Sequence, residues 1–141
     1  MRLILLTMGL WSIAAPVFAD DVQPGLWALT LETSVPATPG FSMPPTTVNQ
    51  CLTEQDAEDP SAVIGGVANP GASDCTFSEK SYTGNTLHFR MECAGTLGMQ
   101  TQGDVTYSAT SIEGNIISTA NMMGQKTELH SKITARRIGD C

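Results

Sequence analysis

Apolar and polar residues alternate over the first part of the chain that follows an N-terminal apolar run. Trp27, Leu29, Leu31, Thr33 and Val35 recur at every second position, and the residues between them are mainly polar. Successive side chains of a β-strand point to opposite faces of a sheet, so this period of two predicts a strand with one buried face over residues 25–35.

Similar patterns predict six further strands, separated by glycine, proline and other turn-forming residues. Their expected ranges are 46–52, 75–82, 86–94, 96–107, 112–122 and 126–137. Residues 36–45 contain four prolines, which are incompatible with a central strand, and are expected to form a loop. About seven strands joined mostly by tight turns predict an all-β fold, mainly an antiparallel meander, as a curled sheet in the form of a barrel, a half-barrel or a small sandwich.

One short helix is expected among these strands. Thr53 is a suitable N-cap, Asp56 follows it by three residues, and Pro60 ends the run. Residues 61–74 are rich in glycine, alanine and proline and predict a loop.

The N-terminal segment has the features of a secretory signal peptide. Arg2 supplies a positive charge, residues 3–13 are mostly apolar, and Val17 and Ala19 fill the −3 and −1 positions of a cleavage site. The apolar run is shorter than the roughly 20 residues that a membrane-spanning helix needs. We therefore expect residues 1–19 to be removed after Ala19. Residues 20–141 are then expected to form one β-rich periplasmic domain without a membrane span.

All four cysteines, Cys51, Cys75, Cys93 and Cys141, lie after the predicted cleavage site. In an oxidising compartment an even number of cysteines indicates disulfides. The alternative of a zinc site is disfavoured, because zinc ligands usually occur in close pairs, whereas 23, 17 and 47 residues separate successive cysteines here.

The expected hairpin around Gly84 predicts one of the disulfides. With a three-residue turn, the numbers of facing residues sum to 168 and Cys75 faces Cys93, at a distance that a disulfide can bridge. With a two-residue turn the sum becomes 169, and the two cysteines no longer face each other. The first register predicts Cys75–Cys93 and leaves Cys51–Cys141, one of the three connectivities that four cysteines allow.

The charge of the chain limits its partners. Seven lysines and arginines stand against 14 aspartates and glutamates, a formal net charge of −7. Nucleic acids and anionic lipid head groups require a basic surface, so neither is an expected partner. His88 and His130, the only histidines, alternate with apolar residues and are expected on the solvent face, without a G-x-S-x-G motif to accompany them. We expect no catalytic residue, no metal site and no cofactor.

The methionines and the apolar strand faces supply the remaining candidate sites. Met91 and Met99 alternate with apolar residues, which favours the core, whereas Met43, Met122 and Met123 are the candidates for exposure and for Cu(I) binding. The proline-rich loop is expected to fold Phe41 and Met43 over one end of the sheet, either as a ligand-binding lid or, as we favour, as a plug of the core. Four residues on the apolar sides of strands are candidates for the wall of an apolar ligand site: Trp27, Phe89, Met99 and Tyr107.

Four short segments carry a resemblance to a known family. They are residues 23–27 (QPGLW), 48–57 (VNQCLTEQDA), 103–108 (GDVTYS) and 137–141 (RIGDC). Together with the layout of the four cysteines they resemble the domain of unknown function family 3617, small exported proteins found mainly in proteobacteria. The resemblance implies a periplasmic location and no reaction. Members often have a glutamate after the tryptophan and a loop rich in methionine and proline; here Ala28 follows Trp27 and the loop keeps only Met43, which weakens a methionine-based metal site.

These observations favour a periplasmic, non-enzymatic protein, a small binding or envelope-associated module that holds an apolar small molecule between the curled sheet and the loop. The alternative is a structural or adaptor protein that contacts an envelope protein through a strand edge or another part of its surface. A methionine-based copper binder and an enzyme are less favoured.

Overall fold

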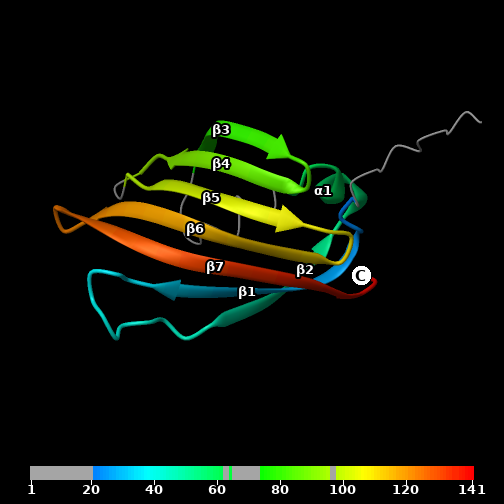
Figure 1. Cartoon of the computed structure of the whole chain (residues 1–141), viewed down its shortest axis with the longest axis horizontal. Coiled ribbons are helices and arrows are strands. Elements are labelled where there is room, and N and C mark those ends of the chain that lie inside the picture. Colours follow the sequence, from blue (N-terminus) through cyan, green and yellow to red (C-terminus); the bar gives the residue numbers. More distant parts are fainter. Residues whose placement is uncertain (1–20, 62–63, 65–73, 96–97) are drawn as a thin grey trace, which may run out of the picture.

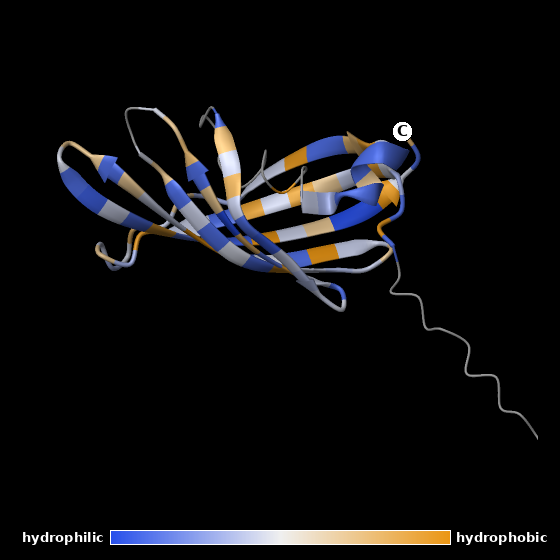
Figure 2. Cartoon of the chain, turned by 90° about the horizontal axis from the view of Figure 1, so that it is seen from above, coloured by the Kyte–Doolittle hydropathy of each residue, from blue (hydrophilic) through white to orange (hydrophobic). Residues whose placement is uncertain are grey.

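Seven antiparallel strands form one sheet in the computed structural model, which describes residues 21–61, 64, 74–95 and 98–141 (Figure 1). The elements in chain order are β1 (Gly25–Ser34), β2 (Thr46–Leu52), α1 (Glu54–Glu58), β3 (Cys75–Thr83), β4 (Thr86–Cys93), β5 (Gln100–Tyr107), β6 (Ser111–Met122) and β7 (Gln125–Gly139). Their order across the sheet is β2-β1-β7-β6-β5-β4-β3, so β2 and β3 are the edges among the described strands, and these strands do not close into a barrel. The predicted seven-stranded fold with a short helix is confirmed, as a strongly curled open sheet (Figure 2).

The meander from β3 to β7 is completed by a pairing between the two ends of the domain. β7, 15 residues long, pairs antiparallel with β6 on one side and with β1 on the other. β1 in turn pairs with β2, with Gly25 opposite Leu52 and Leu31 opposite Thr46. The first strand therefore lies inside the sheet, and β2 becomes the edge.

The two faces of the sheet differ in polarity, as the period of two requires. The core face carries Trp27, Phe89, Ile116 and Ile133, each at most 4% exposed, and continues into a larger apolar cluster. On the opposite, outer face the residues are mainly polar and partly exposed, for example Thr30, Glu32, His88, Asp104 and Lys132. The chain thus buries one side of the sheet, and the other is available for contact.

The turn between β3 and β4 differs from the predicted one. Thr83 lies opposite Thr86, which leaves the two-residue turn Gly84-Asn85, and the facing residues near it sum to 169. The predicted three-residue turn is therefore wrong. Gly84 has a φ of +60°, a left-handed conformation that suits a glycine in a tight hairpin turn.

A β-bulge in β3 restores the predicted register before the cysteines. The ladder shifts at Ser78, which lies between Phe77 and Glu79 and has no facing residue of its own. Cys75 therefore faces Cys93, with Cα atoms 3.9 Å apart, and the two form a disulfide. Cys51 and Cys141 form the second disulfide, 90 residues apart in sequence, so the predicted connectivity is confirmed.

The short helix begins where the sequence predicts. The Thr53 hydroxyl accepts a hydrogen bond from the Asp56 amide at 3.2 Å, and the Asp56 carboxylate accepts one from the Thr53 amide at 2.9 Å. This reciprocal pair satisfies two amide groups that the first turn leaves without helical partners. The predicted signal peptide of residues 1–19 and most of the predicted loop 61–74 lie outside the described residues. In the part of the chain that is described, no helix is long and apolar enough to cross a membrane.

Candidate functional site

A groove of about 670 Å³ runs along the outer face of the sheet, beside the proline-rich loop. Its apolar lining comes from Met43 and Pro45 in the loop and from Ile117 in β6, whereas the side chain of the neighbouring Ile116 lies on the core face. Its polar lining comes from the end of β1, from the interior of β6 and β7, and from the loop: Glu32, Thr33, Ser34, Asn115, His130, Ser131, Lys132 and Ser42. The groove therefore combines an apolar floor with a polar margin, as small-molecule sites commonly do.

Hydrogen bonds to β1 hold the loop at the margin of this groove. Ser34 and Ser42 form an isolated β-bridge, and the Met43 amide donates to the Thr33 carbonyl at 3.0 Å. The prolines next to Met43 fix the following backbone and prevent β2 from beginning before Thr46. The loop thereby places Met43 in the lining of the groove.

The predicted plug of the core is wrong for this loop. Phe41 is 54% exposed and Met43 is 42% exposed, so neither side chain fills the core face. The bridge between Ser34 and Ser42 extends the loop along the sheet on the groove side, which leaves Phe41 at the surface. Met122 and Met123, in the hairpin between β6 and β7, are exposed as predicted.

Polar groups on β7 and β1 form one side of the groove. His130 Nε2 lies 2.6 Å from Glu128 Oε1, and the Ser34 hydroxyl donates to the His130 carbonyl at 3.4 Å. Thr33 and Ser131 share a hydrogen bond at 3.0 Å between their hydroxyls. The contacts of Ser34 and Thr33 connect β1 to β7 beside the groove, and the contact with Glu128 orients the His130 ring.

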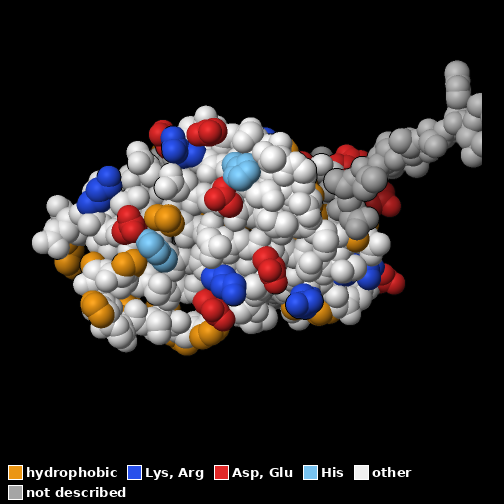
Figure 3. All heavy atoms as spheres, in the orientation of Figure 1, with side chains coloured by type: hydrophobic (Ala, Val, Ile, Leu, Met, Phe, Trp, Pro, Cys, Tyr) orange, Lys and Arg blue, Asp and Glu red, His pale blue; other side chains and the backbone are white. Residues whose placement is uncertain are grey.

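A second hollow, of about 320 Å³, continues the groove across the sheet. Asn115 and Ile117 line both, so the two adjoin along β6. The second hollow contains His88, whose Nδ1 lies 2.5 Å from Asp104 Oδ1, and Arg90, which pairs with Glu79 at 3.7 Å. Figure 3 shows this face, with acidic, basic and histidine side chains over the strands and hydrophobic ones gathered towards the loop and hairpin end.

Both histidines lie on the outer face and are partly exposed, as predicted. Each contacts a carboxylate, and among the described residues neither ring has a serine or threonine hydroxyl bonded to its other nitrogen. The four cysteines are all in disulfides. No group of three or more histidines, cysteines or acidic residues that would suit a metal ion occurs in the described part of the chain.

The four residues predicted to line an apolar ligand site do not meet in one hollow. Trp27 and Phe89 are buried in the apolar core. Tyr107 is half-buried and packs against the edge of that core, beside a hollow of about 480 Å³ next to α1. Met99 is half-buried just before β5. Contact of these four side chains with a ligand stays a prediction. Of the groove residues, Met43 was considered as part of a ligand-binding lid, but Ile117 was not singled out, because the sequence does not show that the loop lies beside the outer face of β6.

A polar cluster joins the end of α1 to the edge strand β3. The Asp59 carboxylate accepts hydrogen bonds from the Ser61 hydroxyl and, at 3.2 Å, from the Tyr82 hydroxyl. Lys80 Nζ lies 3.5 Å from Asp59 and 3.3 Å from Ser61 Oγ, and also above the ring of Phe77. The hydrogen bond from Ser61, more than the charge of Lys80, lowers the pKa of Asp59. The cluster thereby connects the end of α1 to β3 through Asp59, Ser61, Lys80 and Tyr82.

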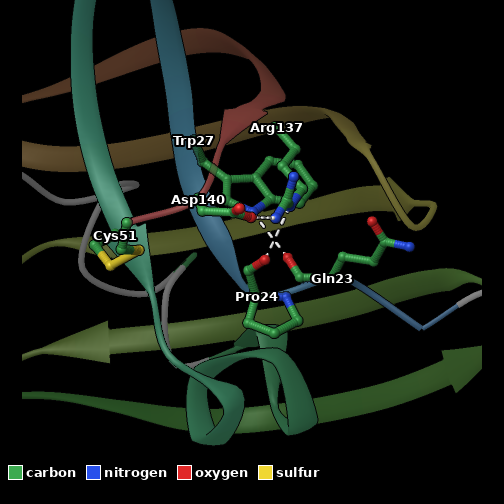
Figure 4. A network of polar contacts seen from close by, with 7 residues as sticks. Gln23, Pro24, Trp27, Cys51, Arg137 and Asp140 are labelled. Carbon is green, nitrogen blue, oxygen red and sulfur yellow. Dashed lines mark hydrogen bonds and ion pairs between the residues drawn. A yellow bond between two sulfur atoms is a disulfide. The ribbon is translucent and has the colours of Figure 1, made fainter.

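Three of the four segments that carried the family resemblance, residues 23–27, 48–57 and 137–141, meet at one corner of the sheet (Figure 4). Trp27 Nε1 donates to the Gln23 carbonyl at 3.0 Å, and Arg137, directly opposite Trp27, donates from Nε to the Pro24 carbonyl at 2.9 Å. Asp140 accepts a hydrogen bond from Arg137, and the adjacent Cys141 is linked to β2. These contacts join the two ends of the domain, and none of these residues lines the groove.

Comparison with known proteins gives a family and no activity. A family model described as a protein of unknown function, DUF3617, matches residues 22–141. No curated protein and no solved structure matches the chain.

Proposed function

We propose that the chain, which belongs to the DUF3617 family, is a non-enzymatic binding module. Its ligand lies in the outer-face groove. The observation that carries this proposal is the groove of about 670 Å³ between the proline-rich loop and the sheet. The ligand is a small molecule with an apolar body and a polar end. Its body contacts Met43, Pro45 and Ile117, and its polar end faces His130 and Lys132.

The proposal includes an extracytoplasmic location. The two disulfides are typical of an oxidising environment outside the cytoplasm. Cleavage after Ala19 then releases the domain into the periplasm, where a carrier for an apolar molecule is useful because such molecules dissolve poorly in water. N-terminal sequencing of the mature protein tests this part, with Asp20 as the expected first residue and Met1 as the contradicting one.

Titration with an environment-sensitive fatty-acid probe tests the ligand site. Binding is expected to saturate with the unmodified mature protein and to weaken in Ile117→Ser and Met43→Ser, which remove apolar contact from the groove. Ile138→Ser is the matched control: Ile138 is also an exposed apolar residue, at 53%, but is absent from the groove lining.

The same titration separates the groove from the core-face site that the sequence predicted. If Met99→Ala changes probe binding and Ile117→Ser does not, the ligand lies on the core face and the groove proposal is wrong. If the unmodified protein binds no probe, a carrier role for this class of apolar ligand is wrong.

A second candidate function is an adaptor that contacts an envelope protein. The observation that favours it is the exposure of Phe41, Met122 and Met123 at the end of the sheet that holds the loop and the β6–β7 hairpin (Figures 1 and 3). Exposed apolar clusters commonly mark protein interfaces. Crosslinking in intact cells tests it: a partner captured from position 41 or 123, and not from position 138, is the expected result.

A further inference from the structure

We infer that β2 is a self-pairing edge, through which two copies of this chain join their sheets in an antiparallel, two-fold arrangement. The inference concerns a surface separate from the ligand groove. It starts from the difference between the two free edges of the sheet, β2 and β3.

The β3 edge has features that discourage pairing with another strand. The bulge at Ser78 interrupts its ladder, and Glu79 and Lys80 place opposite charges along it. Both charges are engaged within the protein, Glu79 with Arg90 and Lys80 with Asp59. Bulges and charges on edge strands are the usual means of preventing edge-to-edge association.

The β2 edge has none of these features. Its ladder with β1 runs from Thr46 to Leu52 without a register shift, and its first four residues are exposed. No described element pairs with its outer side. The disulfide from Cys51 to Cys141 fixes one end of the strand to the segment that follows β7, so this end of the edge is held in place before a partner arrives.

Charge favours a second copy as the partner. The chain carries a formal net charge of −7, so two copies repel each other over most of their surfaces. Residues 33–53, which comprise the end of β1, the proline-rich loop and β2, contain no charged residue. Two copies that meet at β2 therefore bring together the parts of their surfaces that lack charge.

The middle of β2 also suits a two-fold axis. A two-fold perpendicular to the sheet places one residue opposite its own counterpart and keeps the two core faces on the same side. With the axis at Val48, which is 48% exposed, a β-branched residue packs against its copy, and Thr47 faces Asn49 of the second copy. β-branched cross-strand pairs stabilise antiparallel ladders. A strand of this length spans only about 24 Å, so the association is expected to be weak and concentration-dependent.

Sedimentation velocity from micromolar to millimolar protein, with a charge-swap pair, tests the inference. Val48→Glu and Val48→Lys each place like charges at the axis and are expected to raise the dimer dissociation constant by at least about tenfold. An equimolar mixture of the two variants is expected to restore dimers, because the charges then differ. Thr76→Glu and Thr76→Lys, on the exposed β3 edge, are matched controls that are expected to leave the unmodified dimer unchanged.

A measurement on the unmodified protein keeps the test independent of folding defects. Amide hydrogen exchange is expected to slow in residues 46–50 as the protein concentration rises, without a change in β3. A protein that stays monomeric at millimolar concentration, or a mixture that does not restore dimers from folded variants, overturns the inference. The inference is also overturned if amide exchange in β2 slows only when an uncharged peptide is added. That result would identify the edge as a site for an extended segment of another protein.

Discussion

Arg137 donates a hydrogen bond from its side-chain Nε to the main-chain carbonyl of Pro24, 113 residues earlier in the chain, at 2.9 Å. The same guanidinium donates to Asp140 and lies opposite Trp27, which is fully buried. One side chain thereby orders the segment that leads into β1 and the segment that follows β7. Since β1 and β7 are adjacent in the sheet, this contact stabilises the pairing that joins the two ends of the domain.

Removal of this contact is expected to destabilise the domain. Arg137→Ala leaves the Pro24 carbonyl without its charged donor and is expected to reduce the free energy of unfolding by about 1–3 kcal/mol. Arg137→Lys is expected to lose part of this amount, because one ammonium group cannot reproduce the forked geometry of the guanidinium. Urea denaturation followed by Trp27 fluorescence measures both. Arg136→Ala, one residue earlier and on the outer face, is the control and should change the unfolding free energy little.

Gly25 is expected to tolerate no side chain, because it lies within the same corner. Its φ is +141°, and a Cβ atom would come 2.5 Å from the Gly139 carbonyl oxygen and 2.7 Å from Arg137 Nε. Gly25→Ala is therefore expected to cost about 1–3 kcal/mol of unfolding free energy. Gly139→Ala is the matched control, since a Cβ there would meet no atom within 4 Å. Equal losses in the two variants would contradict this account of the corner.

The two disulfides are expected to differ in their contributions to stability. In the chain-entropy model a longer closed loop gives a larger stabilisation, so Cys75–Cys93, with a separation of 18, is worth roughly 3 kcal/mol. Cys51–Cys141, with a separation of 90, is worth roughly 4–5 kcal/mol. Paired Cys→Ser variants compared by guanidinium denaturation measure the two values. A larger loss for the shorter loop would show that loop entropy does not determine the order.

The β3–β4 hairpin shows how far local sequence pattern determines structure. Alternation alone placed both strands within one residue of their ends, and the cysteine pair was predicted correctly. The length of the turn was predicted wrongly, because Gly84-Asn85 forms a two-residue turn. The bulge at Ser78, which compensates for the shorter turn, has no signal in the local sequence. The predicted disulfide is therefore correct because facing residues sum to 168 between the cysteines and the bulge, although they sum to 169 between the bulge and the turn.

The pairing of β1 with β7 could not be predicted from the pattern of either strand. Both strands have an apolar face, and nothing local in the sequence specifies which strand lies beside which when about 100 residues separate them. The predicted Cys51–Cys141 disulfide was the one indication that the C-terminus lies near β2. The position of the proline-rich loop, and with it the groove beside Met43, depends on this pairing, so the candidate site was beyond prediction from sequence.

Stability at acidic pH is expected to depend on Asp59. The hydrogen bond from Ser61 lowers the pKa of Asp59 from its ordinary value of 3.8, so folding favours the charged carboxylate. The stabilisation is fully present above the unfolded-state pKa and is lost as pH falls through the lowered folded-state pKa. Unfolding free energies of the unmodified protein and Asp59→Asn are therefore expected to differ most at pH 6 and to approach each other as the pH falls below 3.8 through the lowered folded-state pKa. Ser61→Ala should reduce the difference, whereas a constant difference across this range would contradict the role of the carboxylate.

Met91 in β4 and Met99 just before β5 are expected to respond differently to truncation, and the difference tests the division between core and surface. Met91 is 2% exposed within the apolar core, so Met91→Ala is expected to cost about 2–5 kcal/mol of unfolding free energy through lost contacts and a residual cavity. Met99 is half-buried just before β5 and lies outside the core cluster, so Met99→Ala is expected to cost clearly less. Thermal and urea unfolding measure both variants. If Met99→Ala costs as much unfolding free energy as Met91→Ala, Met99 fills the core, as the sequence pattern favours. If Met99→Ala costs little unfolding free energy but alters binding of the fatty-acid probe, a ligand contacts Met99 on the core face.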